Sequence, residues 1–151
     1  MKENKKVVNA TPVSTDGIEF KSKLEERIYK ALKRKGINVQ YEPQKIKIWD
    51  CDKLTVPYYD KRGGVFQRIT VKPTCITYEP DFVFVYKGTC VFLEAKGFAN
   101  DVFPYKAKLF RDWLEKKAVE FEPAKYCYAV VYSLKNLELL LSDLDNESKT
   151  V

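Results

Sequence analysis

Apolar residues recur three and four positions apart between residues 22 and 36, and this spacing predicts an amphipathic helix. Ile28 and Leu32 lie on its predicted buried side. Ser22 is a suitable N-cap, and Gly36 follows three basic residues as a suitable C-terminal stop. A helix is therefore the first strong element that we expect along the chain.

Short apolar runs after this helix predict strands, and two of them flank a tight turn at Lys87-Gly88. The less regular segment 50–77 interrupts the series as an insert. Within the insert, two runs flank Lys-Arg-Gly-Gly, which predicts a β-hairpin with a glycine turn. The expected strands lie at residues 37–43, 45–49, 55–60, 65–71, 81–86, 89–96 and 125–133.

A second helix is predicted for residues 100–121. Asp101 is its expected cap, and Leu109, Trp113 and Leu114 form its expected apolar stripe.

The order of the predicted elements indicates a mixed α/β domain. The last pattern, at residues 134–144, predicts a helix, or else a strand and a turn. Polar, aperiodic residues stand at both ends of the chain. We therefore expect a flexible arm at residues 1–17, a single domain at residues 18–145 and a polar tail at residues 146–151.

The composition suits a soluble globular protein, with 45% hydrophobic and 32% charged residues. The net charge of +6 favours a polyanionic partner only weakly, because many basic proteins have no such partner. No apolar run is long enough to span a membrane, and the start of the chain lacks a signal-peptide core. The four cysteines are too scattered for a zinc or disulfide framework, so we expect reduced thiols in the cytoplasm.

The chain contains no histidine. This absence excludes Ser-His-Asp and Cys-His catalysis. If the protein is an enzyme, carboxylates and lysines must carry the chemistry, together with a hard metal ion.

Asp81 and Glu94 are acids inside otherwise apolar runs. If Lys87 and Gly88 form a two-residue turn, the pairing runs back along both strands until Asp81 faces Glu94, with Cβ atoms roughly 4.5–5.5 Å apart. Facing carboxylates repel unless a cation lies between them, and Mg²⁺ prefers such oxygen ligands. Lys96 shares the face of Glu94, where its ammonium can orient a water or stabilise negative charge.

Each acid also has a simpler explanation. Glu94 and Lys96 can form an ordinary ion pair near a strand end, and Asp81 follows a proline, as turn residues often do. Short motifs are weakly specific, but the joint pattern, in register and inside apolar runs, favours a site.

Glu25 borders the buried side of the first helix. Ser22-x-x-Glu25 is also a capping box, in which the acid accepts a hydrogen bond from the N-cap N–H. From the residues alone, helix capping and membership of an acidic site are equally supported.

The Pro-Asp pair at 80–81, the Glu-Ala-Lys triplet at 94–96 and the helical glutamate resemble the PD-(D/E)xK nuclease superfamily. The order of "SKLEERIYKALKRKGINVQYEP", "YEPDFVF" and "VFLEAKG" is most similar to the phage endonuclease I family of Holliday-junction-resolving enzymes. The resemblance covers most of residues 20–132. It implies a restriction-endonuclease-like fold, in which helices flank a mixed β-sheet, here with residues 50–77 as a β-hairpin insert.

The resemblance also implies roles for individual residues. Asp81 and Glu94 would bind Mg²⁺, for which Mn²⁺ is expected to substitute, and the backbone carbonyl of Ala95 would complete the ligands. Lys96 would assist the attacking water. Glu25 would complete the acidic cluster, so the resemblance favours catalysis over capping for this residue.

The expected function is hydrolysis of phosphodiester bonds in branched DNA, such as Holliday junctions, during DNA recombination. A homodimer would supply the two active sites, and a viral source would place it in the host cytoplasm. Two alternatives are a restriction- or transposase-type nuclease of the same superfamily and a non-catalytic nucleic-acid-binding module. The cations expected at DNA phosphates, each of which can equally be a solvated surface charge, are Lys61, Arg62, Arg68, Lys106, Lys108 and Arg111.

Overall fold

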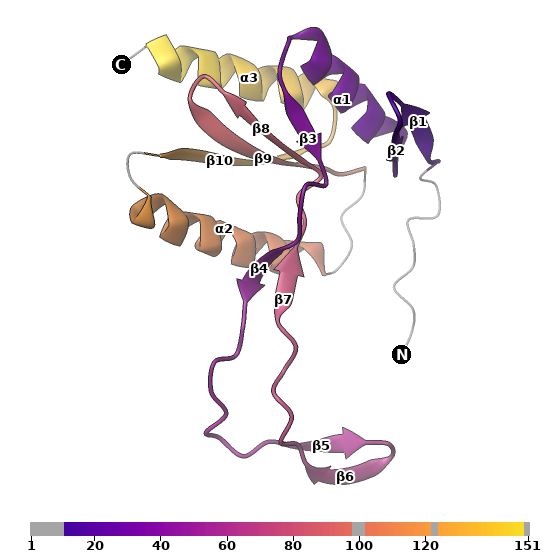
Figure 1. The fold of residues 1–151 in the computed structure, drawn as a ribbon, viewed down its shortest axis with the longest axis vertical. Helices are drawn as coiled ribbons and strands as arrows, with labels where there is room; N and C mark the ends of the chain where they lie inside the picture. Colours follow the sequence, from indigo (N-terminus) through magenta and orange to yellow (C-terminus); the bar gives the residue numbers. More distant parts are fainter. Residues whose placement is uncertain (1–10, 98–101, 122–123, 150–151) are drawn as a thin grey trace.

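A four-stranded mixed sheet, ordered β10-β9-β8-β3, forms the centre of the computed structural model, which describes residues 11–97, 102–121 and 124–149 (Figure 1). β9 and β10 run parallel, whereas β8 is antiparallel to both of its neighbours. Helices flank this sheet, which confirms the expected α/β class. The strands are β3 (Val39–Tyr41), β8 (Phe82–Tyr86), β9 (Thr89–Ala95) and β10 (Lys125–Val131).

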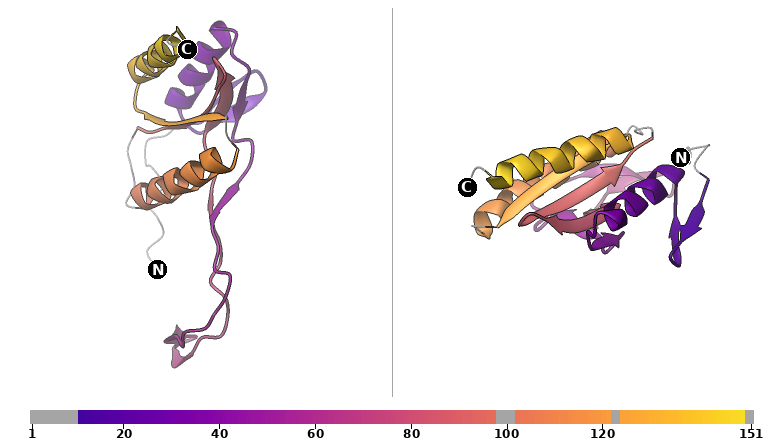
Figure 2. Two further views of the ribbon diagram at one scale, coloured as in Figure 1. Left: turned by 90° about the vertical axis from the view of Figure 1, so that its left-hand side faces the viewer. Right: turned by 90° about the horizontal axis from the view of Figure 1, so that it is seen from above.

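Helices cover both faces of the sheet. α1 (Lys23–Arg34) and α3 (Leu134–Lys149) lie on one face, and α2 (Phe103–Glu120) lies on the other (Figures 1 and 2). α3 shows that residues 134–144 are helical, and it continues into the expected polar tail as far as Lys149. No helix in the described ranges is long and apolar enough to cross a membrane.

Alternation along the strands divides the core into two clusters. Phe82 and Leu93 are fully buried in the cluster under α1 and α3. Val83 and Phe92 point to the opposite face, into the cluster under α2. Alternate residues along β8 and β9 therefore face different helical layers.

The predicted ends of α1 are confirmed. The Ser22 hydroxyl accepts a hydrogen bond from the Glu25 N–H at 3.2 Å, as an N-cap does. The chain leaves the helix through Gly36, whose φ of 72° is favourable for glycine. Ile28 and Leu32 are both fully buried, as their spacing predicts.

The expectation of a flexible arm through residue 17 is wrong for the part that the structure describes. β1 (Val13–Thr15) and β2 (Ile18–Phe20) form an antiparallel hairpin before α1. Phe20 is 1% exposed, and its ring centroid lies 5.1 Å from that of Tyr29. Strands of three residues are too short for an alternation pattern to reveal, and packing on α1 fixes them instead.

The apolar stripe of α2 is shifted from the expected one. Phe110 is fully buried at its centre, next to buried Leu114, and the Trp113 ring stacks on Phe110 at 5.7 Å. Leu109 is only half-buried and belongs to neither core cluster. Asp101, the expected cap, lies outside the described residues.

The insert forms an extended arm (Figure 1). β4 (Ile46–Trp49) and β7 (Ile76–Tyr78) pair at its base, and β5 (Tyr59–Arg62) and β6 (Val65–Arg68) form the hairpin at its tip. The tip turns through two glycines with positive φ angles, which confirms the predicted glycine turn. We call residues 50–75, which lie between the two base strands β4 and β7, the arm.

The turn between β8 and β9 sets the register of the central hairpin. Lys87 and Gly88 have φ angles of 49° and 78°, and a type I′ turn requires positive values at both positions. Tyr86 pairs with Thr89, and the ladder continues to Phe82 opposite Leu93. The predicted two-residue turn and its register are therefore confirmed.

We predict that Gly88→Ala lowers the free energy of unfolding by about 1 kcal/mol, because alanine is strained at a φ of 78°. Urea unfolding followed by circular dichroism measures the loss. Gly97→Ala is the matched control, since neither glycine has another atom within 4 Å of an added Cβ and only Gly88 has a positive φ. Equal losses in the two variants would contradict the role of the turn.

Candidate functional site

Asp81 and Glu94 meet at the open end of the β8–β9 hairpin. The ladder ends at Phe82 opposite Leu93, and one further step in the same register places Asp81 opposite Glu94. Alternation directs both acids to the face of the sheet that α2 covers, because Val83 and Phe92 lie on that face. The register thus forms one site from two sequence segments.

The Asp81 carboxylate is held by the backbone of the facing strand. The Ala95 N–H donates a hydrogen bond to Asp81 Oδ2 at 2.7 Å. The residue opposite Ala95 in this register is Pro80, which has no N–H to donate to the Ala95 carbonyl, so the regular ladder ends here. The Ala95 N–H donates to the Asp81 side chain instead of to a ladder partner. On the side of β8 that faces β3, the Glu42 N–H donates a hydrogen bond to the Asp81 carbonyl at 2.8 Å.

Burial and the negative charge of Glu94 raise the pKa of Asp81 to about 8, and Glu25 adds to this effect. The Ala95 N–H and the Lys96 ammonium act in the opposite direction, but they do not outweigh burial and repulsion. Burial and repulsion therefore disfavour two charged carboxylates at this site unless a cation is added.

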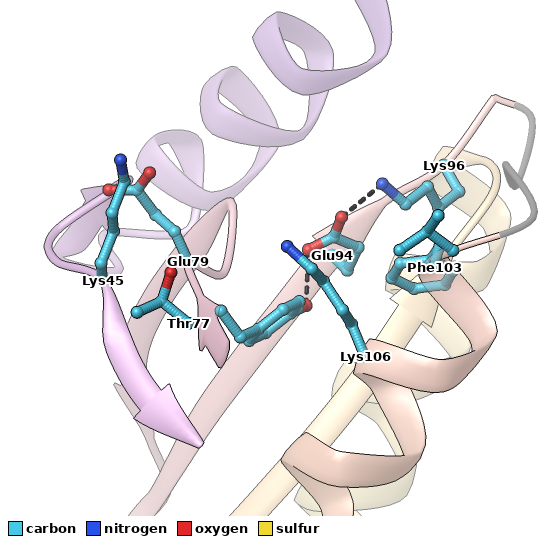
Figure 3. A pocket seen from close by; sticks show the side chains of 9 residues that line it. Lys45, Thr77, Glu79, Glu94, Lys96, Phe103 and Lys106 are labelled. Atoms are coloured by element: carbon cyan, nitrogen blue, oxygen red, sulfur yellow. Dashed lines mark hydrogen bonds and ion pairs between the residues drawn. The ribbon is translucent and has the colours of Figure 1, made fainter. Parts of the chain in front are cut away.

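Glu94 is buried, with 5% of its surface exposed, and both carboxylate oxygens have partners. The Tyr78 hydroxyl donates to Oε2 at 2.6 Å, and Lys96 Nζ lies 2.5 Å from Oε1 (Figure 3). The Tyr78 hydroxyl also lies 3.0 Å from that of Tyr128. Burial and the charge of Glu94 raise the pKa of Tyr78, which keeps its hydroxyl protonated as a donor.

A pocket of about 380 Å³ opens beside Glu94 (Figure 3). Three lysines line it, Lys45 before β4, Lys96 after β9 and Lys106 on α2. Phe103 forms part of the wall, and Lys96 Nζ lies 4.4 Å from the centre of its ring. Lysines around a buried carboxylate suit a pocket that admits an anionic group. Asp81 is not among the residues that line the pocket.

The donors present fit a hard divalent cation. Asp81 and Glu94 supply two carboxylates, and the carbonyl of Ala95 leaves β9 on the same side as its N–H, which faces Asp81. Mg²⁺ commonly binds through one or two carboxylates and keeps several waters. Among the described residues, no three His, Cys, Asp or Glu side chains are grouped so that they could hold a metal ion together.

Hydrogen bonds hold the Glu25 side chain at the start of α1. Its carboxylate accepts hydrogen bonds from the Ser22 hydroxyl at 2.8 Å, the Lys21 N–H at 3.0 Å and the Tyr41 hydroxyl at 2.7 Å. Its negative charge nevertheless helps to raise the pKa of Asp81, so it belongs to the electrostatic surroundings of the site. Glu25 thus holds the start of the helix through the Ser22 hydroxyl and the Lys21 N–H, whereas the capping box was expected to use the Ser22 N–H. The catalytic role of Glu25 stays a prediction.

The six cations expected at DNA phosphates fall into separate groups. Lys106 lines the pocket beside Glu94. Lys108 and Arg111 are exposed on α2, and Arg111 lines a second pocket with Tyr126 and Tyr128. The remaining three lie at the tip of the arm and are exposed, namely Lys61, Arg62 and Arg68.

The sequence did not single out several residues that shape the site. Tyr78 and Tyr128 come from different strands, and only tertiary contacts bring their hydroxyls to Glu94. A tyrosine two residues before Pro80 is a weak signal that could have pointed to Tyr78. Lys45 carries no signal in its local sequence.

In metal-free protein, we predict that Asp81→Asn raises the free energy of unfolding by about 1–3 kcal/mol at pH 8. The folded-state pKa of Asp81, about 8, lies above the ordinary aspartate value of 3.8. Stability is therefore greatest below that ordinary value and falls as the pH rises toward 8. Asparagine removes the buried charge and keeps an oxygen for the Ala95 N–H.

Urea unfolding in the presence of a chelator at pH 5 and pH 8 measures this effect. The advantage of Asp81→Asn over the unaltered protein is expected to grow between the two pH values. Asp112→Asn, at an exposed acid on α2, is the control and should show no such growth. A pH-independent difference for Asp81→Asn would contradict the buried charge.

Comparison with known proteins places the chain in a family. No curated protein and no solved structure matches it significantly. Residues 5–132, which make up most of the chain, match the family described as "Protein of unknown function (DUF1064)". The chain therefore belongs to the DUF1064 family.

Proposed function

We propose that this protein is a metal-dependent endodeoxyribonuclease that hydrolyses phosphodiester bonds in branched DNA such as Holliday junctions. The observation that carries the proposal is the facing pair of Asp81 and Glu94, with Lys96 bound to Glu94. Glu94 lines a pocket together with three lysines, and such a pocket suits a phosphate. The resemblance of the same residues to the PD-(D/E)xK nucleases supports the same chemistry.

Each group of the site has a task in this proposal. The carboxylates of Asp81 and Glu94 and the carbonyl of Ala95 would hold Mg²⁺ or Mn²⁺. When bound, the ion would supply positive charge at the phosphate and lower the pKa of a water. Tyr78 fixes the orientation of Glu94 through its hydrogen bond to Oε2.

The lysines act on the substrate. Lys96 neutralises Glu94 in the structure, and its ammonium can turn to a phosphate oxygen or orient a water. Lys45 and Lys106 line the same pocket and can hold the scissile phosphate through its charge. Glu25 would add negative charge near Asp81 without leaving its cap.

Branched DNA as the substrate calls for two cuts in opposite strands. A homodimer supplies two equivalent sites related by two-fold symmetry, so we propose a homodimer as the active form. We also propose that the protein acts in the cytoplasm, where free cysteines such as its four are usual, and this is the host cytoplasm if the source is viral.

We predict that the protein with Mg²⁺ cuts a labelled four-way junction faster than a linear duplex of the same sequence. Asp81→Asn should reduce cleavage by at least about a hundredfold, because it removes one charged ligand, while binding to the junction persists. Gel electrophoresis of the products measures cleavage, and gel filtration of the same preparation tests the dimer.

The control for this assay is Asp112→Asn, which alters an exposed acid outside the site and should cut like the unaltered protein. Equal cutting of junction and duplex would remove the preference for branches and favour another nuclease of the superfamily. If no DNA is cut, the protein is a binding module. Full activity of Asp81→Asn would overturn the site.

We also predict that Lys106→Gln weakens junction binding about three- to tenfold and reduces its dependence on salt, because one phosphate contact is lost. Lys116→Gln is the matched control, since Lys116 is exposed on the same helix and lies outside the pocket. Fluorescence anisotropy at several salt concentrations measures both effects. If the two variants bind alike, the pocket has no special part in holding DNA.

A further inference from the structure

One face of the hairpin at the tip of the arm carries only aromatic and basic side chains. Tyr59 pairs with Arg68, and Lys61 pairs with Phe66, so alternation directs all four to the same side. The rings of Tyr59 and Phe66 stack, with centroids 6.0 Å apart and planes inclined by 26°. We call these four residues the aromatic face.

The aromatic face is open. Tyr59 is 52% exposed and Phe66 is 68% exposed, and both cations are exposed as well. In the described part of the chain, no acid forms an ion pair with Lys61 or Arg68. Two large rings in water are costly to leave uncovered, because burial of each would be favourable.

The opposite face of the same hairpin has different chemistry. It carries Asp60, Arg62, Val65 and Gln67, so its acid and its base balance each other. Asp60 accepts hydrogen bonds from the Tyr58 hydroxyl at 2.8 Å and from the backbone N–H of the next residue at 2.7 Å. Gln67 Nε2 donates to the Arg62 carbonyl at 3.2 Å. The two faces therefore differ in both charge and aromatic content.

We infer that the aromatic face binds unpaired bases of a DNA strand, which stack on Tyr59 and Phe66 while Lys61 and Arg68 contact the flanking phosphates. Aromatic rings beside cations are the usual platform for single strands, because every base has a flat face and every linkage has a negative charge. The choice of DNA as the polymer rests on the proposed function.

The positive charge of the aromatic face favours a DNA strand as its partner over a second copy of this chain. Two copies of the face packed on each other would bring four cations together without an acid between them. A nucleic acid strand supplies both flat rings and negative charge. A base-paired duplex offers phosphates but keeps its base faces stacked inside, so it should bind this face less well.

Fluorescence anisotropy in the presence of a chelator tests the inference without cleavage. The probe is a labelled oligothymidylate of about 20 nucleotides, which exceeds the strand length that one small binding domain covers. Phe66→Ser should weaken binding of this probe about tenfold with little change in salt dependence, because a stacking contact is lost. Binding of a labelled duplex should change less.

Matched controls come from the opposite face of the hairpin. Val65→Ser removes an exposed apolar residue next to Phe66 and should bind like the unaltered protein. Lys61→Ser should lower the slope of log affinity against log salt concentration by about 0.7, as expected for one phosphate contact to a single strand. Arg62 is itself one of the cations expected at DNA phosphates, so Arg62→Ser compares the two faces and should lower the slope less than Lys61→Ser does.

The outcomes separate this inference from the proposed nuclease. Unaltered binding by Phe66→Ser, or an equal loss for Val65→Ser, overturns the aromatic face even if junctions are cut. If sedimentation shows a dimer that Phe66→Ser dissociates, a second copy covers the face and the inference is wrong. If no DNA is cut but Phe66→Ser still binds the probe weakly, the inference stands and the nuclease fails.

Discussion

The repulsion between Asp81 and Glu94 is the constraint that the surrounding structure serves. At a separation of roughly 5 Å, two unit charges in a partly buried site repel by about 3 kcal/mol. Hydrogen bonds to charged groups contribute about 1.5–3 kcal/mol each, so a few of them offset this cost. The Ala95 N–H, the Tyr78 hydroxyl and the Lys96 ammonium are those partners. Burial, together with the remaining repulsion from Glu94, raises the pKa of Asp81, as is common where structure is arranged for function.

Local rules were enough to predict the pairing of the two acids. A two-residue turn with glycine fixes the register of a hairpin, and alternation then determines which side chains share a face. The register of β8 and β9 followed from Lys87-Gly88, and the position of Lys96 beside Glu94 followed from the period of two. The two ends of α1 were also predicted by local rules, because the cap lies directly before the first turn and the stop lies directly after the last turn.

Features that depend on distant contacts could not be predicted in this way. The hydroxyl of Tyr78 reaches Glu94 only because β7 passes next to the sheet, and Lys45 joins the pocket from the other side of the arm's base. The stripe of α2 was expected at Leu109, but Phe110 takes the central place among the aromatic rings of β7, β9 and β10. Phe103, Ala107, Phe110 and Leu114 keep the helical spacing, so the periodicity holds, and packing decided which of the neighbouring apolar residues face the sheet.

The base of the arm and the candidate site share residues, which links the two proposals physically. Tyr78 ends β7 and donates to Glu94, while Thr77 on the same strand lines the pocket. β7 pairs with β4 in an antiparallel ladder, which closes the base of the arm. The chain that returns from the arm therefore enters the candidate site directly, because β7 ends at Tyr78, whose hydroxyl orients the carboxylate of Glu94.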